Sequence, residues 1–183
     1  MACSANLAGI KASCDSSMGG IKKVWMASVD DITPVLDASA ETITGLTITV
    51  GDDHTKTVAD VFKGYNFKKN TASMTSTLNV DVANGTNYVS TELALTFLRQ
   101  DTEKRIEMAA LAVADCYVIV LDSNGTYWYL GYDEPVYATA GSANSGTAKS
   151  DGNNYQLTLT DESNTFPYEI KGSEIIDALK SIA

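Results

Sequence analysis

Two long segments of alternating residues, 71–82 and 86–99, restrict what this chain can fold into. Polar Ser, Thr, Asn and Asp side chains occupy every second position of the first segment. The apolar residues between them share one side: Met74, Leu78, Val80 and Val82. A period of two residues indicates a half-buried β-strand, and Asn84-Gly85 is a dipeptide favoured in two-residue hairpin turns. The sequence therefore predicts a long antiparallel hairpin.

The second segment resumes the same alternation and leads into a predicted helix. Its expected inward residues are Val89, Leu93, Leu95 and Phe97. Asp101 is a suitable N-cap, and Glu103 suits the positive end of the helix dipole. Apolar residues then recur at helical spacing: Ile106, Ala109, Ala110 and Val113. We expect a helix near 102–114 that packs this face across the sheet.

The remaining patterns complete a mainly β chain. Residues 116–121 and 126–132 predict a second hairpin about a turn at 122–125, and further strands are expected at 21–29, 43–50, 58–68, 135–140 and 154–160. Pro34 favours a loop over 30–42, and Ser173 is the expected cap of a short C-terminal helix. The predicted fold is a β-sandwich or partly open barrel of about eight strands with one flanking helix.

Two segments carry little periodicity. Residues 1–20 are rich in Ala, Ser, Gly and Cys, and we interpret them as an N-terminal arm before a single domain at 21–183. The arm is either a frayed terminus or a segment that orders on a neighbouring subunit. Residues 141–153 consist almost entirely of small and polar residues, which predicts a flexible hairpin tip.

The charge limits the classes of partner. The chain has 23 Asp and Glu against 13 Lys and Arg, a formal net charge of -10. A surface that grips nucleic acid needs clustered cations, so specific binding is not expected, whereas an acidic wall would let DNA slide past. No window is apolar enough to cross a bilayer and the amino terminus lacks a signal-peptide pattern, so we expect a non-secreted, soluble protein without membrane partners.

No pattern in the sequence predicts catalysis. His54 is the single histidine and lies in a polar turn with Asp52 and Asp53, which are adjacent and would converge poorly on a metal ion. The pairs Asp30-Asp31 and Asp161-Glu162 are interpreted as solvated loop ends. Three cysteines give no disulfide framework, and phosphate-binding and nucleophile motifs are absent. We expect no enzyme activity and no catalytic, cofactor or metal residues.

Aromatic residues leave one alternative of another class open. A carbohydrate-binding or adhesion module could use a stacking platform, although aromatic residues that alternate along strands are more often core. The residues concerned are Trp25, Tyr127, Trp128, Tyr129, Tyr132, Tyr137 and Tyr155.

Three segments, 67–81, 128–135 and 151–161, resemble a family of virion structural proteins from tailed phages of Bacteroides-type bacteria. The chain is most similar to their major tail or tail tube subunits. This resemblance implies a β-sandwich that assembles with itself, as hexameric rings, into a hollow tube for viral DNA in the phage tail. Other tail or neck proteins would be its partners, and a neck or head-to-tail ring protein of similar fold is the alternative.

Under this interpretation, two groups of residues are candidates for function. Candidate assembly contacts come from the arm and the tip: Met18, Gly19, Gly20, Ser142, Asn144 and Lys149. Candidate acidic residues of the lumen or ring faces are Asp81, Glu92 and Asp122.

Overall fold

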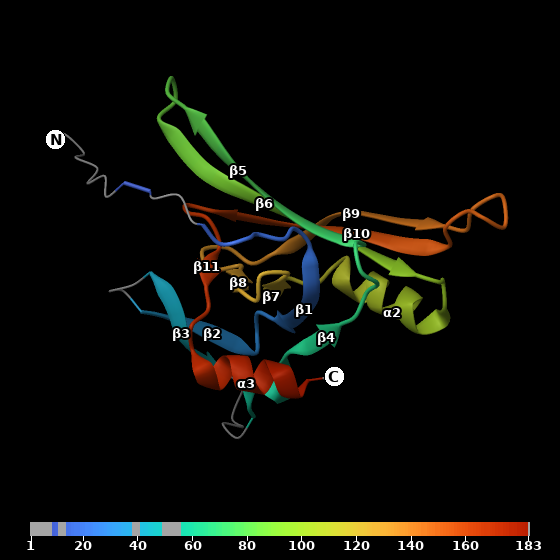
Figure 1. The fold of residues 1–183 in the computed structure, drawn as a ribbon, viewed down its shortest axis with the longest axis horizontal. Helices are drawn as coiled ribbons and strands as arrows, with labels where there is room; N and C mark the ends of the chain where they lie inside the picture. Colours follow the sequence, from blue (N-terminus) through green and yellow to red (C-terminus); the bar gives the residue numbers. More distant parts are fainter. Residues whose placement is uncertain (1–8, 11–13, 38–40, 49–55, 183) are drawn as a thin grey trace.

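The computed structural model describes residues 9–10, 14–37, 41–48 and 56–182 and has a mainly β fold (Figure 1). The strands are β1 (Ile21–Ser28), β2 (Ile32–Asp37), β3 (Thr42–Ile48), β4 (Lys63–Tyr65), β5 (Ala72–Asp81), β6 (Thr86–Leu98), β7 (Cys116–Asp122), β8 (Tyr127–Leu130), β9 (Tyr137–Asn144), β10 (Asn154–Ser163) and β11 (Tyr168–Glu169). The helices are α1 (Val58–Val61), α2 (Thr102–Leu111) and α3 (Ser173–Ser181). These elements form three layers.

The central layer is a five-stranded sheet in the order β11-β8-β7-β1-β4. Alternate residues of its strands enter two different cores, so Val118 and Val120 pack on one side and Ile119 on the other. All three are fully buried. A strand buried on both faces needs a continuous apolar run, which explains the sequence Tyr-Val-Ile-Val-Leu in β7.

The second layer is a four-stranded sheet in the order β5-β6-β10-β9, in which every neighbouring pair is antiparallel. Leu93, Leu95, Leu157 and Leu159 face the central sheet and are at most 2% exposed. The residues between them face solvent. The alternation of 86–99 predicted this half-buried layer, whereas in 71–82 the apolar Leu78, Val80 and Val82 are exposed instead of buried.

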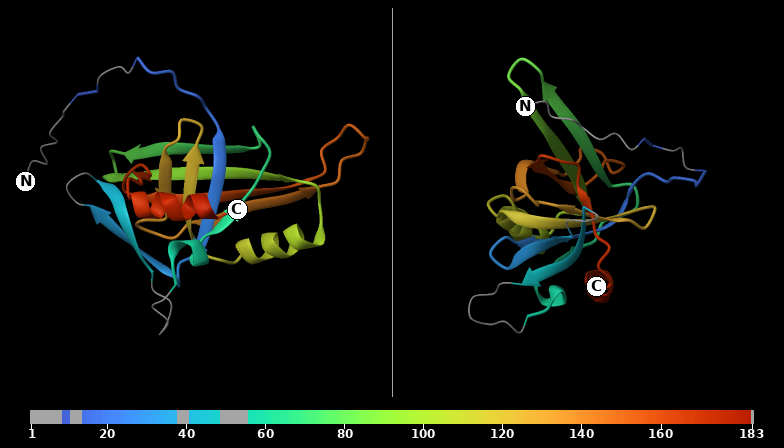
Figure 2. Two further views of the ribbon diagram at one scale, coloured as in Figure 1. Left: turned by 60° about the horizontal axis from the view of Figure 1, so that its bottom comes forward. Right: turned by 90° about the vertical axis from the view of Figure 1, so that its left-hand side faces the viewer.

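The third layer covers the opposite face of the central sheet with the β2–β3 ribbon, α1 and α3 (Figure 2). Trp25 and Tyr129 of the central sheet pack there against Phe62 of the α1–β4 junction and Leu179 of α3.

The third layer accounts for two wrong predictions. The loop expected over 30–42 contains β2, because Pro34 can occupy a strand of an isolated ribbon, which has an open edge. The strand expected over 58–68 is α1 followed by β4.

Three predicted boundaries also differ. The β5–β6 loop contains four residues, 82–85, because Asp81 pairs directly with Thr86. Strand β9 extends to Asn144, which pairs with Asn154, so the hairpin tip begins at 145 instead of 141. The N-cap of α3 is Gly172, and no side chain caps this helix.

The prediction of α2 was correct in position and wrong in orientation. Asp101 caps it by accepting a hydrogen bond from the backbone N–H of Lys104 at 2.8 Å. However, Met108 and Leu111 face the core, whereas Ile106 is 57% exposed and Val113, just beyond the helix, is 87% exposed. The apolar stripe visible in the sequence therefore points away from the molecule.

Candidate assembly surfaces

The four-stranded sheet ends in two strands whose outer sides are unpaired. Within the described part of the chain, β5 pairs with β6 alone and β9 with β10 alone. Unpaired strand edges expose a row of backbone donors and acceptors that can bind another strand. Because the strand directions alternate, β5 and β9 run in opposite directions and can pair antiparallel between two copies.

The solvent face of this sheet is polar and lacks cations. Thr75 of β5 and Glu92 of β6 lie side by side there, and Thr160 of β10 continues the row in the register but is only 7% exposed. Strands β5, β6, β9 and β10 contain no Lys, Arg or His, and their charged residues are Asp81, Glu92, Asp161 and Glu162. All 13 basic residues of the chain lie elsewhere. This face therefore offers no cation to a phosphate.

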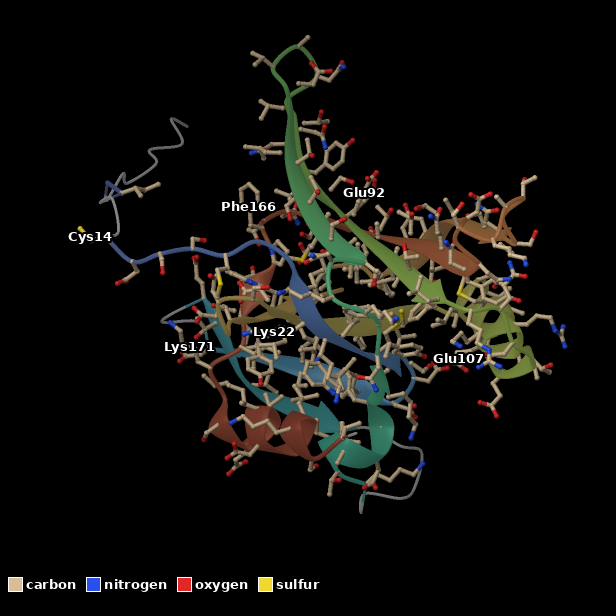
Figure 3. All side chains as sticks on the ribbon, turned by 45° about the vertical axis from the view of Figure 1, so that its right-hand side comes forward. Cys14, Lys22, Glu92, Glu107, Phe166 and Lys171 are labelled. Carbon is tan, nitrogen blue, oxygen red and sulfur yellow. The ribbon has the colours of Figure 1, made fainter. Side chains whose placement is uncertain are left out.

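Of the three candidate acidic residues, Glu92 and Asp81 belong to this sheet, and strand alternation places both on its solvent face, with Glu92 near the middle (Figure 3). Asp81 is at the far end of β5 and accepts hydrogen bonds from the backbone of Ala83 and from Asn84. These bonds hold the pKa of its carboxyl below the ordinary value. Asp81 thus also closes the β5–β6 loop.

Asp122 belongs to the central sheet and organises the β7–β8 turn. Its carboxylate accepts hydrogen bonds from the backbone N–H groups of Asn124 and Thr126 at 2.8 and 2.9 Å, and from Trp128 Nε1 at 3.3 Å. Desolvation opposes ionisation, but these bonds prevail and lower the pKa of Asp122. The structure therefore separates the three carboxylates by location and gives two of them a role in turns.

The candidate contacts of the arm lie next to that same turn. The backbone N–H of Met18 donates to Asn124 Oδ1 at 2.8 Å, and Gly20 O accepts from the N–H and the hydroxyl of Ser123, each at 3.0 Å. Met18, Gly19 and Gly20 are exposed. The arm is thus fixed to the domain at its last residues, while residues 1–8 and 11–13 lie outside the described part.

The candidate contacts of the tip lie on and beyond the free edge. Ser142 and Asn144 belong to β9, and Lys149 lies in the loop that connects β9 to β10. Asp151 organises this loop, because its carboxylate accepts the backbone N–H groups of Thr147 and Ala148 at 2.8 and 2.7 Å. The part of the tip expected to be flexible at 141–144 is paired strand.

Sequence patterns were misinterpreted at Asp161, which is buried between the two large sheets. It is 2% exposed, and its Oδ1 accepts the backbone N–H of Gly131 at 3.0 Å. Desolvation outweighs this bond and raises the pKa of Asp161 to about 6. Its neighbour Glu162 is exposed, so the pair is not a solvated loop end. Asp161 is two residues beyond Leu159 and four beyond Leu157, so it lies on the same buried face of β10. This alternation was the signal in the sequence for the burial of Asp161.

Three lysines line a groove away from the four-stranded sheet. An open groove between the β7–β8 turn, β11 and α3 is lined by Lys22, Lys171 and Lys180. Figure 3 shows Lys22 and Lys171 away from Glu92. Lys171 pairs with Glu169 at 3.2 Å and Lys180 with Asp177 at 3.1 Å. Two of these three lysines are thus neutralised by ion pairs, and Glu169 also lines the groove.

Among the described residues, no group of three His, Cys, Asp or Glu could hold a metal ion. Asp52, Asp53 and His54 lie outside the described residues. Burial raises the pKa of the Cys116 thiol to about 11, as expected of a structural cysteine.

The aromatic residues do not form one exposed platform. Trp25, Tyr127 and Tyr129 are at most 9% exposed, and Trp25 stacks on Tyr127 at 6.0 Å between ring centroids. Tyr132 and Tyr168 meet edge to face at 4.9 Å. Most of this set stabilises the cores, which weakens the carbohydrate-binding alternative.

Within the described residues, none of the helices combines the length and apolar character that crossing a bilayer requires. Comparison with models of protein families and with curated proteins finds no match to this chain.

Proposed function

We propose that this protein is a structural subunit that joins with copies of itself into rings, and that stacked rings form the tail tube of a phage. The observation that carries the proposal is the four-stranded sheet with free edges β5 and β9. These edges are long, they run in opposite directions, and one face between them is polar and free of cations.

Edge pairing explains these features together. If β5 of one copy pairs with β9 of the next, the sheets join into one antiparallel sheet and no edge remains exposed in a closed ring. The buried face stays on the central sheet, so the solvent face lines the lumen. DNA passing through would meet hydroxyl groups and carboxylates such as Glu92, without a lasting attachment point.

The proposal covers the role of the molecule in the virion as well as its assembly. The resemblance of 67–81, 128–135 and 151–161 to tail tube subunits supports a tail tube of hexameric rings, with adjoining tail or neck proteins as partners. It also supports the absence of enzyme activity.

Proline substitutions in the edge strand β9 test the proposal. In a strand, adjacent N–H groups point to opposite sides, so one of Ser142 and Ala143 donates toward β10 and the other toward the free edge. Proline removes the N–H and blocks further pairing at that position. We expect one of Ser142→Pro and Ala143→Pro to weaken the hairpin, and the other to leave a folded monomer that forms no rings.

Negative-stain microscopy and thermal unfolding would separate these outcomes. The parent protein at high concentration should form rings or tubes, whereas the edge-blocked variant should show the parent melting temperature and no rings. Normal rings from both variants, each correctly folded, would contradict edge pairing. A parent protein that remains monomeric at every concentration would contradict the function itself.

A further inference from the structure

Helix α2 has a second apolar face that its own chain does not use. Met108 and Leu111 attach the helix to the core. On the opposite side Ile106 and Val113 are 57% and 87% exposed. Ala109 and Ala110 are also exposed and complete a stripe, which we call the α2 stripe. A face with helical spacing of apolar residues is typical of packing against another element.

The β5–β6 hairpin has a matching apolar face. Leu78, Val80 and Val82 are 49%, 61% and 89% exposed, and we call them the hairpin patch. They continue the buried face of the sheet beyond the central layer, because Leu78 pairs with the buried Val89. Figure 1 shows this hairpin projecting away from the body. Leu78 and Val80 share one face of the projecting hairpin and Val82 follows in its loop, and such exposed branched apolar side chains mark a contact surface.

The two surfaces lie at opposite ends of the molecule. The hairpin loop precedes β6 and α2 follows it, and the 13 residues of β6 span about 40 Å. Figures 1 and 2 also place α2 at the same end as the β9–β10 tip. The two surfaces therefore cannot meet within one chain. Two copies arranged head to tail along the strand direction bring them together.

The two surfaces are compatible in charge. Arg105 borders the stripe and forms no ion pair with a described carboxylate. The hairpin has no cation, and its Asp81 lies at the end of β5 on the face opposite Leu78 and Val80. The hairpin of a neighbouring copy thus offers the stripe an apolar surface and brings no second cation to Arg105.

We propose that the hairpin patch of each copy packs on the α2 stripe of a copy in the next ring and so holds stacked rings together. This contact rests on the proposed function and specifies its stacking surface. A head-to-tail contact between different patches does not close on itself and propagates as a filament. One such contact is small, but a ring repeats it once per copy, and binding strengthens with each repeat.

A disulfide trap tests the contact directly. Val82→Cys and Val113→Cys are combined in one chain in which Cys3 and Cys14 are replaced by Ser. Because the two sites cannot meet within a chain, mild oxidation of assembled protein should give a ladder of linked chains on a non-reducing gel. Each single variant should give no ladder, and an equal mixture of both should give dimers.

Charged variants test the same contact by loss of stacking. Val113→Asp places a carboxylate in the α2 stripe, whereas Ala112→Asp places it about 100° around the helix and serves as the matched control. We expect Val113→Asp to form separate rings in micrographs and Ala112→Asp to form tubes. Tubes from Val113→Asp, or tubes of the double-cysteine chain without a ladder, overturn the contact and leave the function intact. Absence of rings in the parent protein overturns both.

Discussion

The four-stranded and the five-stranded sheet are both antiparallel and share a core, yet they follow different sequence rules. β7 of the central sheet is apolar at successive positions, because the strand is buried on both sides. β6 of the outer sheet alternates, because one side faces solvent. The difference teaches that the central sheet is enclosed by its own chain, whereas the outer sheet leaves one face and two edges uncovered.

The largest expected effect compares two adjacent residues of β6. Leu95 is 1% exposed, so Leu95→Asp places an unpaired charge in the core at a cost of about 4 kcal/mol or more and should prevent folding. Ala94 is exposed on the other face, so Ala94→Asp should stay folded. Circular dichroism and thermal melting measure both. An unchanged melting temperature for Leu95→Asp would show that the face assignment is wrong.

The same comparison in β7 should give no such contrast. Ile119 and Val120 are both fully buried on opposite sides of the central sheet. Each truncation to Ala should lower the free energy of unfolding by about 2–4 kcal/mol, since each leaves a cavity in a different core. Denaturant titration measures these losses. If one of the two truncations were neutral, the central sheet would have a solvent-like face and the three-layer description would fail.

A pH-dependent effect of similar or smaller size is expected at Asp161. Its pKa is raised by burial to about 6 in the folded state, so the folded protein holds this proton more tightly than the unfolded chain. The resulting stabilisation is complete below a pH of about 4 and disappears as the pH rises toward 6. Its full size is about 3 kcal/mol.

Asp161→Asn should remove this dependence, because the amide keeps an acceptor for the N–H of Gly131 but does not titrate. The difference in unfolding free energy between the variant and the parent, measured from pH 4 to 7, should shift in favour of the variant. Glu162→Gln at the exposed neighbour is the control and should leave the dependence unchanged. Parallel curves for Asp161→Asn and the parent would rule out a buried titrating carboxyl.

The smallest expected effect on stability concerns the solvent face. Glu92→Lys should leave the melting temperature unchanged, because the residue is exposed. In assembled tubes, however, it should cause DNA retention that falls with salt, since each added phosphate contact lowers the logarithm of the binding constant by about 0.9 per tenfold rise in salt. Glu174→Lys on α3 makes the same charge change away from the sheet. Equal retention by both variants would place the lumen elsewhere.

The alternating strands were predictable because burial on one face imposes a period of two on the sequence. Val89, Leu93, Leu95 and Phe97 are all buried as expected.

The α2 stripe and the hairpin patch were misassigned for a common reason. Periodicity reports that a face is apolar, but it does not tell whether the same chain covers it, and both faces lie on elements that extend beyond the cores.

The candidate site was less predictable than the fold. The free edges of β5 and β9 follow from the strand order, which joins residues far apart in the sequence, such as the β6–β10 pair. The pairing of β9 with β10 as far as Asn144 was hidden by Gly, Ser and Ala residues with low strand preference. Glu92 was placed correctly on a polar face because its neighbours Leu93 and Thr91 alternate with it.

The number of strands in the outer sheet has a further consequence. The outer sheet has an even number of antiparallel strands, so its two edge strands run in opposite directions. Any number of copies can then close into a ring without a parallel seam, and strand pairing alone selects no particular symmetry. In the proposed ring, the angle at which one copy meets the next would instead set the number of copies. In the proposed tube, changes at the edges, such as removing the extra residue Thr139 of β9, should therefore alter the diameter before they alter the fold.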